Sequence, residues 1–360
     1  MTKQRPRLPL IDTLKAGASQ LIVLHHLAFY GPMSDLAYPL APATIDWLYD
    51  YARIAVQVFL VVAGFLAARS LAPTGQPRVL ALGPTLLARY CRLALPLMVA
   101  VLASILSAAI ARNLLASDAI PLAPTLVQLL SHALLLQGVL DHESLSAGVW
   151  YVAIDFQLFA VLGLTLAVAR RHPRQPWLTP ALVATAGVVS LFYFNRQPGL
   201  DDWWMYFFGA YALGACAQWA GSRKRSVLWL VLMAGIGLAA EWFDFRSRIA
   251  IALATALLLA VAMREDWLTR WPDTAVTRWL ARISYSVFLI HFPVCLLCNA
   301  LIFRLFPASP ALNLAGMALA WLASLVAGHF FHQHVELRCA RLVSRRLEML
   351  PSAPVRTESS

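Results

Sequence analysis

The first apolar stretch of the chain holds side chains that could bind and move protons. In IDTLKAGASQLIVLHH, Lys15 and His26 are eleven residues apart. On an α-helix this separation is three turns plus roughly 20°, so both would lie on one face, about 16 Å apart along the axis. Asp12 would fall within about 40° of His26, whereas His25 would point about 80° away from Lys15. An ionisable group inside an apolar helix is costly, which makes His26 a functional candidate, although Lys15 could also reach water along its flexible stem.

Two arginines and an aspartate in later stretches are also suited to chemistry. In LLARYCRLALP, Arg89 and Arg92 are three residues apart and share a helical face. Their planar guanidinium groups suit phosphate, although arginines at the end of a span also serve as topological anchors. In GVWYVAIDFQLF, Asp155 follows Trp150 by about 7 Å of helix. We expect Asp155 to lie at the depth of His26 and to orient that histidine as a general base.

The last two apolar stretches carry further histidines. In ARISYSVFLIHFPV, Ser284 and His291 are seven residues apart, two turns along one helical face. The segment HFFHQHVELR groups His329, His332 and His334 with Glu336. A metal site is conceivable there, but histidines at a membrane interface are commoner, so we predict that no metal is bound.

The composition of the whole chain indicates a membrane protein. Of its 360 residues, 60% are hydrophobic and only 13% are charged, far from the balance of a soluble domain. The net charge of +11 could suggest a nucleic-acid partner. In a membrane protein, however, Lys and Arg report which loops face the cytoplasm, so we expect the lipid bilayer and no nucleic acid as a partner.

Ten apolar stretches are long enough to cross about 30 Å of hydrocarbon as helices. We therefore predict an all-α, polytopic membrane helix bundle with about ten transmembrane helices, at residues 10–30, 54–71, 87–111, 150–169, 177–194, 203–220, 227–242, 249–263, 280–303 and 311–331.

An eleventh apolar stretch, residues 126–140, could cross the membrane or could be interfacial or re-entrant. If it does not cross, most Lys and Arg residues of the loops fall on one side, and the other side holds only Arg53, Arg112, Arg196, Arg246, Arg248 and Arg304. If it did cross, every later basic loop would face the wrong way. We therefore expect that it does not cross and that both termini are cytoplasmic. We further expect one membrane domain over residues 1–340, followed by a basic, cytoplasmic and disordered tail over residues 341–360.

The motifs, taken in order, resemble the integral-membrane acyltransferases of family 3, which include O-acetylases of bacterial surface polysaccharides. IDTLKAGASQLIVLHH is similar to the first-helix pattern of that family, with Lys15 and His26 at the family spacing. RYCR matches its Arg-x-x-Arg element, and ISYSVFLIHFPV closely resembles its Ile-Ser-Tyr-Ser signature with a following His-x-Pro. VFLVVAGFLAA, VWYVAIDFQLF and HVELR resemble three further elements, so the resemblance covers residues 10 to about 340.

The chain departs from the family pattern at four positions. Ala63 stands where the family usually has Ser, and Tyr151 replaces the Ser after Trp150. Asp155 stands in place of the commoner Glu, and Arg338 in place of the usual Pro. The shorter acid at position 155 sets its carboxylate about one bond back, which weakens the expected pairing with His26.

The resemblance implies a membrane O-acyltransferase of the bacterial inner membrane. Members pass an acyl group, most often acetyl from cytoplasmic acetyl-CoA, to a hydroxyl of an extracytoplasmic glycan or lipid-linked glycan, with acyl-CoA as a donor substrate and no bound cofactor. His26 would be the base, with Asp155 and Lys15 as further catalytic residues, and His25 a neighbour packed on another helix. The expected substrate-binding residues are Arg89, Arg92, Trp150, Ser284, Tyr285, His291 and Glu336.

Two other functions remain possible from the residues alone. Helices with buried Lys, His, Asp and Glu would also suit a proton-coupled transporter or a glycan flippase. Such a carrier is expected to have an internal repeat, and we see none between the two halves of the sequence. A non-catalytic membrane assembly protein would leave the ordered motifs without an explanation.

Overall fold

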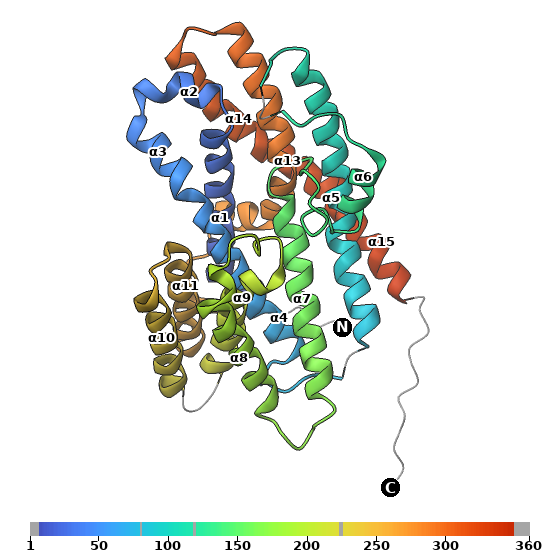
Figure 1. The fold of residues 1–360 in the computed structure, drawn as a ribbon, viewed down its shortest axis with the longest axis vertical. Coiled ribbons are helices and arrows are strands. Elements are labelled where there is room, and N and C mark those ends of the chain that lie inside the picture. The colour runs from blue at the N-terminus through green and yellow to red at the C-terminus, as the bar shows by residue number, and fades with distance from the viewer. Residues whose placement is uncertain (1–6, 80, 118–119, 223–225, 349–360) are drawn as a thin grey trace.

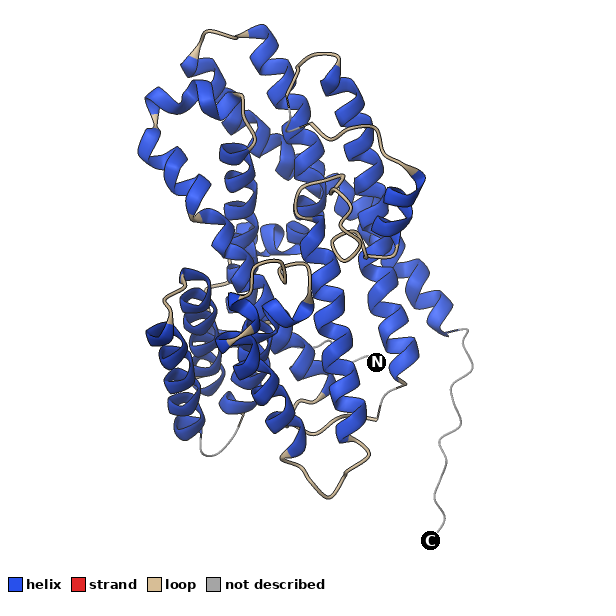
Figure 2. Cartoon of the chain, in the orientation of Figure 1, coloured by secondary structure: helices blue, strands red, loops and turns tan. Residues whose placement is uncertain are grey.

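The computed structural model describes residues 7–79, 81–117, 120–222 and 226–348, and all regular structure in these ranges is helical (Figure 2). Each of the ten predicted stretches forms a helix, so their predicted helical structure is confirmed. The helices are α1 (Pro9–Phe29), α4 (Val56–Leu71), α5 (Leu82–Arg112), α7 (Val149–Ala169), α8 (Leu178–Phe192), α9 (Trp204–Gly221), α10 (Ser226–Phe243), α11 (Ser247–Arg264), α13 (Ala275–Leu305) and α14 (Pro310–Phe331).

In the described part of the chain, 7 helical segments are both long and apolar enough to cross a membrane. They contain α4, α5, α7, α8, α11, α13 and α14. The protein is therefore a multi-pass membrane protein, whereas ten crossings and cytoplasmic termini stay predictions. α1 is 21 residues long but carries Asp12, Lys15 and two histidines, which lower its hydropathy.

The connection between α5 and α7 returns alongside α5 before α7 begins. Its one α-helix in the described residues, α6 (Leu126–Ala133), has 8 residues and would span only about 12 Å, so it is too short to cross, as predicted. The Tyr90 hydroxyl, near the start of α5, donates to the Ala133 carbonyl at 2.5 Å. The His132 ring donates to the Gln128 carbonyl at 2.7 Å and accepts from the Leu145 amide at 3.1 Å. The chain has therefore returned from the end of α5 to the depth of Tyr90 before α7 begins.

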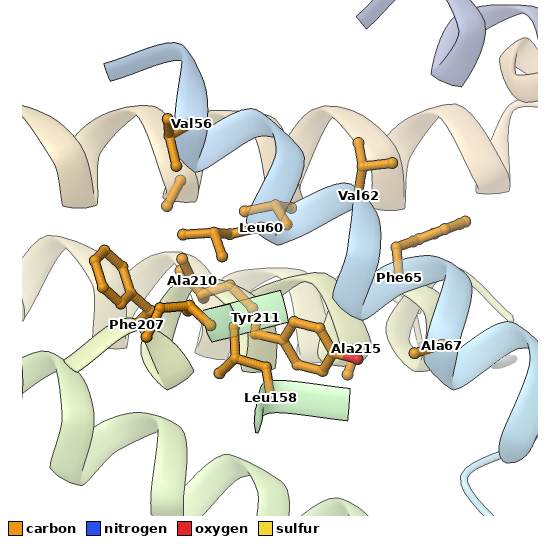
Figure 3. Close-up of a cluster of buried hydrophobic side chains, with 14 of the residues drawn as sticks. Val56, Leu60, Val62, Phe65, Ala67, Leu158, Phe207, Ala210, Tyr211 and Ala215 are labelled. Carbon is orange, nitrogen blue, oxygen red and sulfur yellow. The ribbon is translucent and has the colours of Figure 1, made fainter. Parts of the chain in front are cut away.

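Helices α4 and α9 pack with their backbones in contact, around a core that α7 completes. A Cβ added at Gly64 would collide with the backbone of Tyr211, and one added at Gly214 would collide with the backbone of Val61. Small residues permit such close approach between helices in membranes. Figure 3 shows Leu158 of α7 beside the side chain of Tyr211, and Leu60 of α4 in the same cluster on the side of Ala210. This core fixes the position of α4 relative to α7.

Helix α13 connects the parts of the molecule that carry the predicted motifs. It packs against α1, α5 and α14, which run beside it in Figure 1. The short helices α2 (Met33–Ala37) and α3 (Pro42–Asp50) lie at the far end of α1.

At the end of the chain, residues 337–348 form helix α15. The predicted disordered tail is therefore wrong for residues 341–348, whose repeated arginines and apolar residues make an amphipathic helix. Residues 349–360 lie outside the described ranges.

Candidate active site

A cavity of about 750 Å³ lies among α1, α4, α5, α7 and α13, a volume typical of small-molecule sites. On α4 its lining extends from Phe59 to Leu71, and along α5 it extends from Ala81, the residue just before the helix, to Leu93. Each of these stretches corresponds to about 18 Å of helix, so the cavity is elongated. Seven of the predicted site residues line it: Lys15, Arg89, Arg92, Asp155, Ser284, Tyr285 and Glu336.

Arg89 and Asp155 form an ion pair across the cavity wall, from α5 to α7. The Asp155 side chain is only 5% exposed, so its charge depends on the arginine for compensation. The Arg89 guanidinium also lies over the Phe159 ring, 5.2 Å from its centre, and its buried Nε has no hydrogen-bond partner. Arg89, predicted to bind the donor, and Asp155, predicted to orient His26, are therefore partners of each other.

Tyrosines surround this ion pair. Tyr151, Tyr211 and Tyr285 all lie near Arg89 and Asp155, and Tyr151 and Tyr285 line the cavity together with them. The Tyr285 hydroxyl donates to the Leu93 carbonyl at 3.0 Å, which joins α13 to α5. Tyr211 and Phe159 escaped the sequence analysis because aromatic residues in apolar helices are usually core residues and carried no motif.

Glu336 is directed at the cavity by an unusual turn of helix. Residues His332–Glu336 form a π-helical turn between α14 and α15, a feature often found at functional sites. One carboxylate oxygen of Glu336 accepts hydrogen bonds from Ser286 Oγ at 2.5 Å and from His332 Nδ1 at 3.0 Å. Lys15 interacts electrostatically with Asp12 and with Glu336. The cavity therefore contains two compensated charge clusters, while Arg92 is exposed in it.

His26 and His291 form a pair beyond the cavity. Their rings are parallel to within 3°, and His26 Nδ1 lies 2.6 Å from His291 Nε2. His291 Nδ1 must donate to the Val287 carbonyl at 3.1 Å, because a carbonyl oxygen only accepts. In neutral His291 the Nε2 atom is then the acceptor, so His26 donates from Nδ1 and its own Nε2 carries a free lone pair. His26 is partly exposed, whereas His291 is fully buried.

The expected pairing of Asp155 with His26 is wrong. Asp155 bonds to Arg89, and His26 bonds to His291. The prediction assumed that α7 begins at the outer surface, but the chain before α7 has already returned to the level of Tyr90, next to Arg89. Asp155 therefore lies at the depth of the arginines rather than at the depth of His26.

The remaining predicted residues have other partners. His25 is buried and donates from Nδ1 to the Leu48 carbonyl at 2.9 Å, which confirms that it packs on another helix. Trp150 stacks on Phe207 at 5.5 Å and does not line the cavity.

His329 accepts from Trp279 Nε1 at 3.1 Å, and His334 stacks on Phe330. Ser284 donates to the Ala281 carbonyl at 2.9 Å, so its hydroxyl proton is already used.

Comparison with known proteins agrees with the order of the motifs. A family model described as an acyltransferase domain, the family-3 acyltransferases, matches residues 8–329. A curated protein of Caenorhabditis elegans, the regulator of hypoxia-inducible factor 1, is 21% identical over 425 aligned positions, which cover 96% of this chain and 82% of that protein. No solved structure is significantly similar. The matched family model covers the helices that build both the cavity and the histidine pair, and the chain therefore belongs to the family-3 acyltransferases.

Proposed function

We propose that the protein is an O-acyltransferase of the bacterial inner membrane that moves an acyl group, most often acetyl, from cytoplasmic acyl-CoA to a hydroxyl of an extracytoplasmic glycan or related acceptor. The observation that carries the proposal is the arrangement of His26 and His291 beyond a charged, elongated cavity. Family membership supports acyl transfer, and the geometry supports a division of the site into a donor part and a proton-transfer part.

The cavity suits a long anionic donor. Coenzyme A carries phosphates at one end and its thioester at the other, joined by an extended arm. Arg92 is exposed in the cavity, while the charge of Arg89 is compensated by Asp155, so Arg92 is the better candidate for a phosphate. Lys15 lies near the same level as these groups, and His26 follows it by about 16 Å along α1. An extended donor arm would run across that distance.

His26 would act as the general base. Its Nε2 takes the proton of the acceptor hydroxyl as the hydroxyl oxygen attacks the thioester carbonyl carbon. The tetrahedral intermediate collapses, the carbon–sulfur bond breaks, and the thiolate of CoA takes the proton back from His26 Nε2. His291 holds His26 through the Nδ1–H bond, which keeps the lone pair on Nε2 and stabilises the imidazolium that forms.

The acceptor would approach His26 on the side of α2 and α3. The Tyr30 ring lies 5.5 Å from His26, and Phe29 stacks on Tyr49 at 5.0 Å. Aromatic rings next to a general base can bind the face of a sugar ring. The loops at this end of α1 are therefore the proposed source of acceptor specificity.

The test is acceptor-dependent consumption of the thioester. Purified protein in detergent or liposomes is supplied with acetyl-CoA and candidate glycans. The release of free CoA is followed with a thiol reagent, and the mass of the glycan product is measured by mass spectrometry. The proposal predicts CoA release that requires the acceptor, with an acetylated glycan as the product. A transporter or flippase would move its substrate across the liposome membrane without consuming the thioester, and that result would refute the proposal.

A further inference from the structure

Phe288 of α13 touches both halves of the site. It lines the cavity, together with Ser284 and Tyr285 of the same helix. Its ring centre is 6.3 Å from that of His291, which follows one turn later on α13. Along α13, Phe288 therefore lies between the cavity and the histidine pair.

The ring of Phe288 is held in place by its neighbours. The Tyr151 ring meets it edge to face, with the centres 5.5 Å apart. On another side lies Gly148, where an added Cβ would be 2.9 Å from the tip of the ring. Gly148 has a φ of +80°, a conformation that glycine adopts readily, so the backbone comes close to the ring there. Phe288 is 5% exposed and has little room to move aside.

We propose that Phe288, supported by Tyr151, closes the acyl end of the donor cavity and restricts the enzyme to short acyl groups. The inference rests on the proposed function, because it takes an acyl-CoA as the ligand of the cavity. For the thioester carbonyl to meet a hydroxyl held by His26, the acyl chain must lie against the Phe288 ring. Extra methylene groups would then clash with the Phe288 ring, which its neighbours hold in place. Overpacking of this kind is costly.

The experiment measures the binding of acyl-CoAs of increasing length to the purified full-length protein. Labelled acetyl-CoA is displaced by butyryl-, hexanoyl- and octanoyl-CoA. In Phe288→Ala, the affinity for hexanoyl-CoA relative to acetyl-CoA should rise by about tenfold or more, the scale on which pockets discriminate methylene groups. Phe288→Leu removes less of the ring and should give a smaller rise. The matched control is Phe292→Ala, which truncates a buried ring one turn later that packs on Tyr30 and does not line the cavity.

The outcomes separate this inference from the proposed function. If wild-type protein binds no acyl-CoA, the donor itself is wrong and the proposed function fails along with the inference. If wild-type protein binds acetyl-CoA but the length preference is unchanged in Phe288→Ala, the inference alone is overturned. Should Phe288→Ala not fold, Phe288→Leu decides, and an unchanged preference there overturns the inference. An equal shift in Phe292→Ala would also overturn it, because the effect would then not be specific to the cavity.

Discussion

His26 and His291, 265 residues apart in the sequence, lie with parallel rings and with His26 Nδ1 2.6 Å from His291 Nε2. The Val287 carbonyl holds the other nitrogen of His291, so the tautomers of both rings follow from one chain of hydrogen bonds. That chain leaves the lone pair of His26 on Nε2, where a general base needs it. A second histidine thus does the orienting work that is often done by a carboxylate.

Removing the orienting ring should slow the chemistry without weakening donor binding. In His291→Ala, His26 loses the acceptor for its Nδ1–H, so we expect kcat to fall by at least about tenfold while the donor KM stays within about twofold. His291→Gln can still offer a carbonyl oxygen to His26 and should retain more activity than His291→Ala. Steady-state kinetics with acetyl-CoA check both variants. A raised KM with an unchanged kcat would contradict the orienting role.

Arg92→Gln should weaken binding of the donor, because Arg92 is the residue proposed to contact the donor phosphates. Because Arg92 is exposed in the cavity and binds by charge, we expect the KM for acetyl-CoA to rise by about tenfold, with a smaller effect on kcat. The matched measurement uses an acetyl thioester of N-acetylcysteamine, which lacks phosphates, and there the variant should equal the wild type. An equal loss with both donors would remove Arg92 from phosphate binding.

Substitutions at Arg89 and Asp155 should have coupled effects on thermal stability, because the two side chains form one ion pair. Arg89→Gln leaves the buried Asp155 charge uncompensated, so we expect the apparent Tm in detergent to fall by roughly 5 °C or more. Asp155→Asn should also destabilise, and the double variant should recover part of the loss because no lone charge remains. Additive losses in the double variant would show that the two side chains act independently.

The contact between α4 and α9 should not tolerate a side chain at Gly64. In Gly64→Ala the new Cβ collides with the Tyr211 backbone, which cannot yield without moving α9. We expect a large fall in the yield of folded protein, read by fluorescence-detected size-exclusion chromatography. The control is Gly235→Ala in α10, where a Cβ would meet nothing within 4 Å and a helical Gly-to-Ala change is neutral or stabilising. Equal yields from the two variants would contradict the close packing.

Much of the helical fold could be predicted from local patterns. All ten stretches predicted from apolar length form helices, and α6 is too short to cross a membrane, as expected for residues 126–140. The cavity-lining positions of Lys15, Arg89 and Glu336 agree with the motifs. The helices depend on residues close in sequence, where the helical period fixes relative directions, whereas Lys15, Arg89 and Glu336 were indicated by the family motifs.

The partners of the charged groups could not be predicted in the same way. The sequence predicts that Asp155 lies at the depth of His26, because it does not show that the chain after α5 turns back to Tyr90 before α7 begins. His291 was identified as a site residue, but its contact with His26 depends on how α13 packs on α1. The π-helical turn that directs Glu336 arises where Ser286 and His332 both bond to its carboxylate, and no sequence signal marks it.

The measurement that tests the account most directly compares acyl transfer in His26→Ala and His25→Ala. The two histidines are neighbours, but His26 Nε2 carries the free lone pair and His25 is bonded to the Leu48 carbonyl. We predict that His26→Ala lowers the rate of acyl transfer by at least about 100-fold while the abundance and Tm stay near those of the wild type. His25→Ala should lower the Tm but keep most of the activity in the protein that folds. An active His26→Ala enzyme alongside a folded but inactive His25→Ala enzyme would contradict the account.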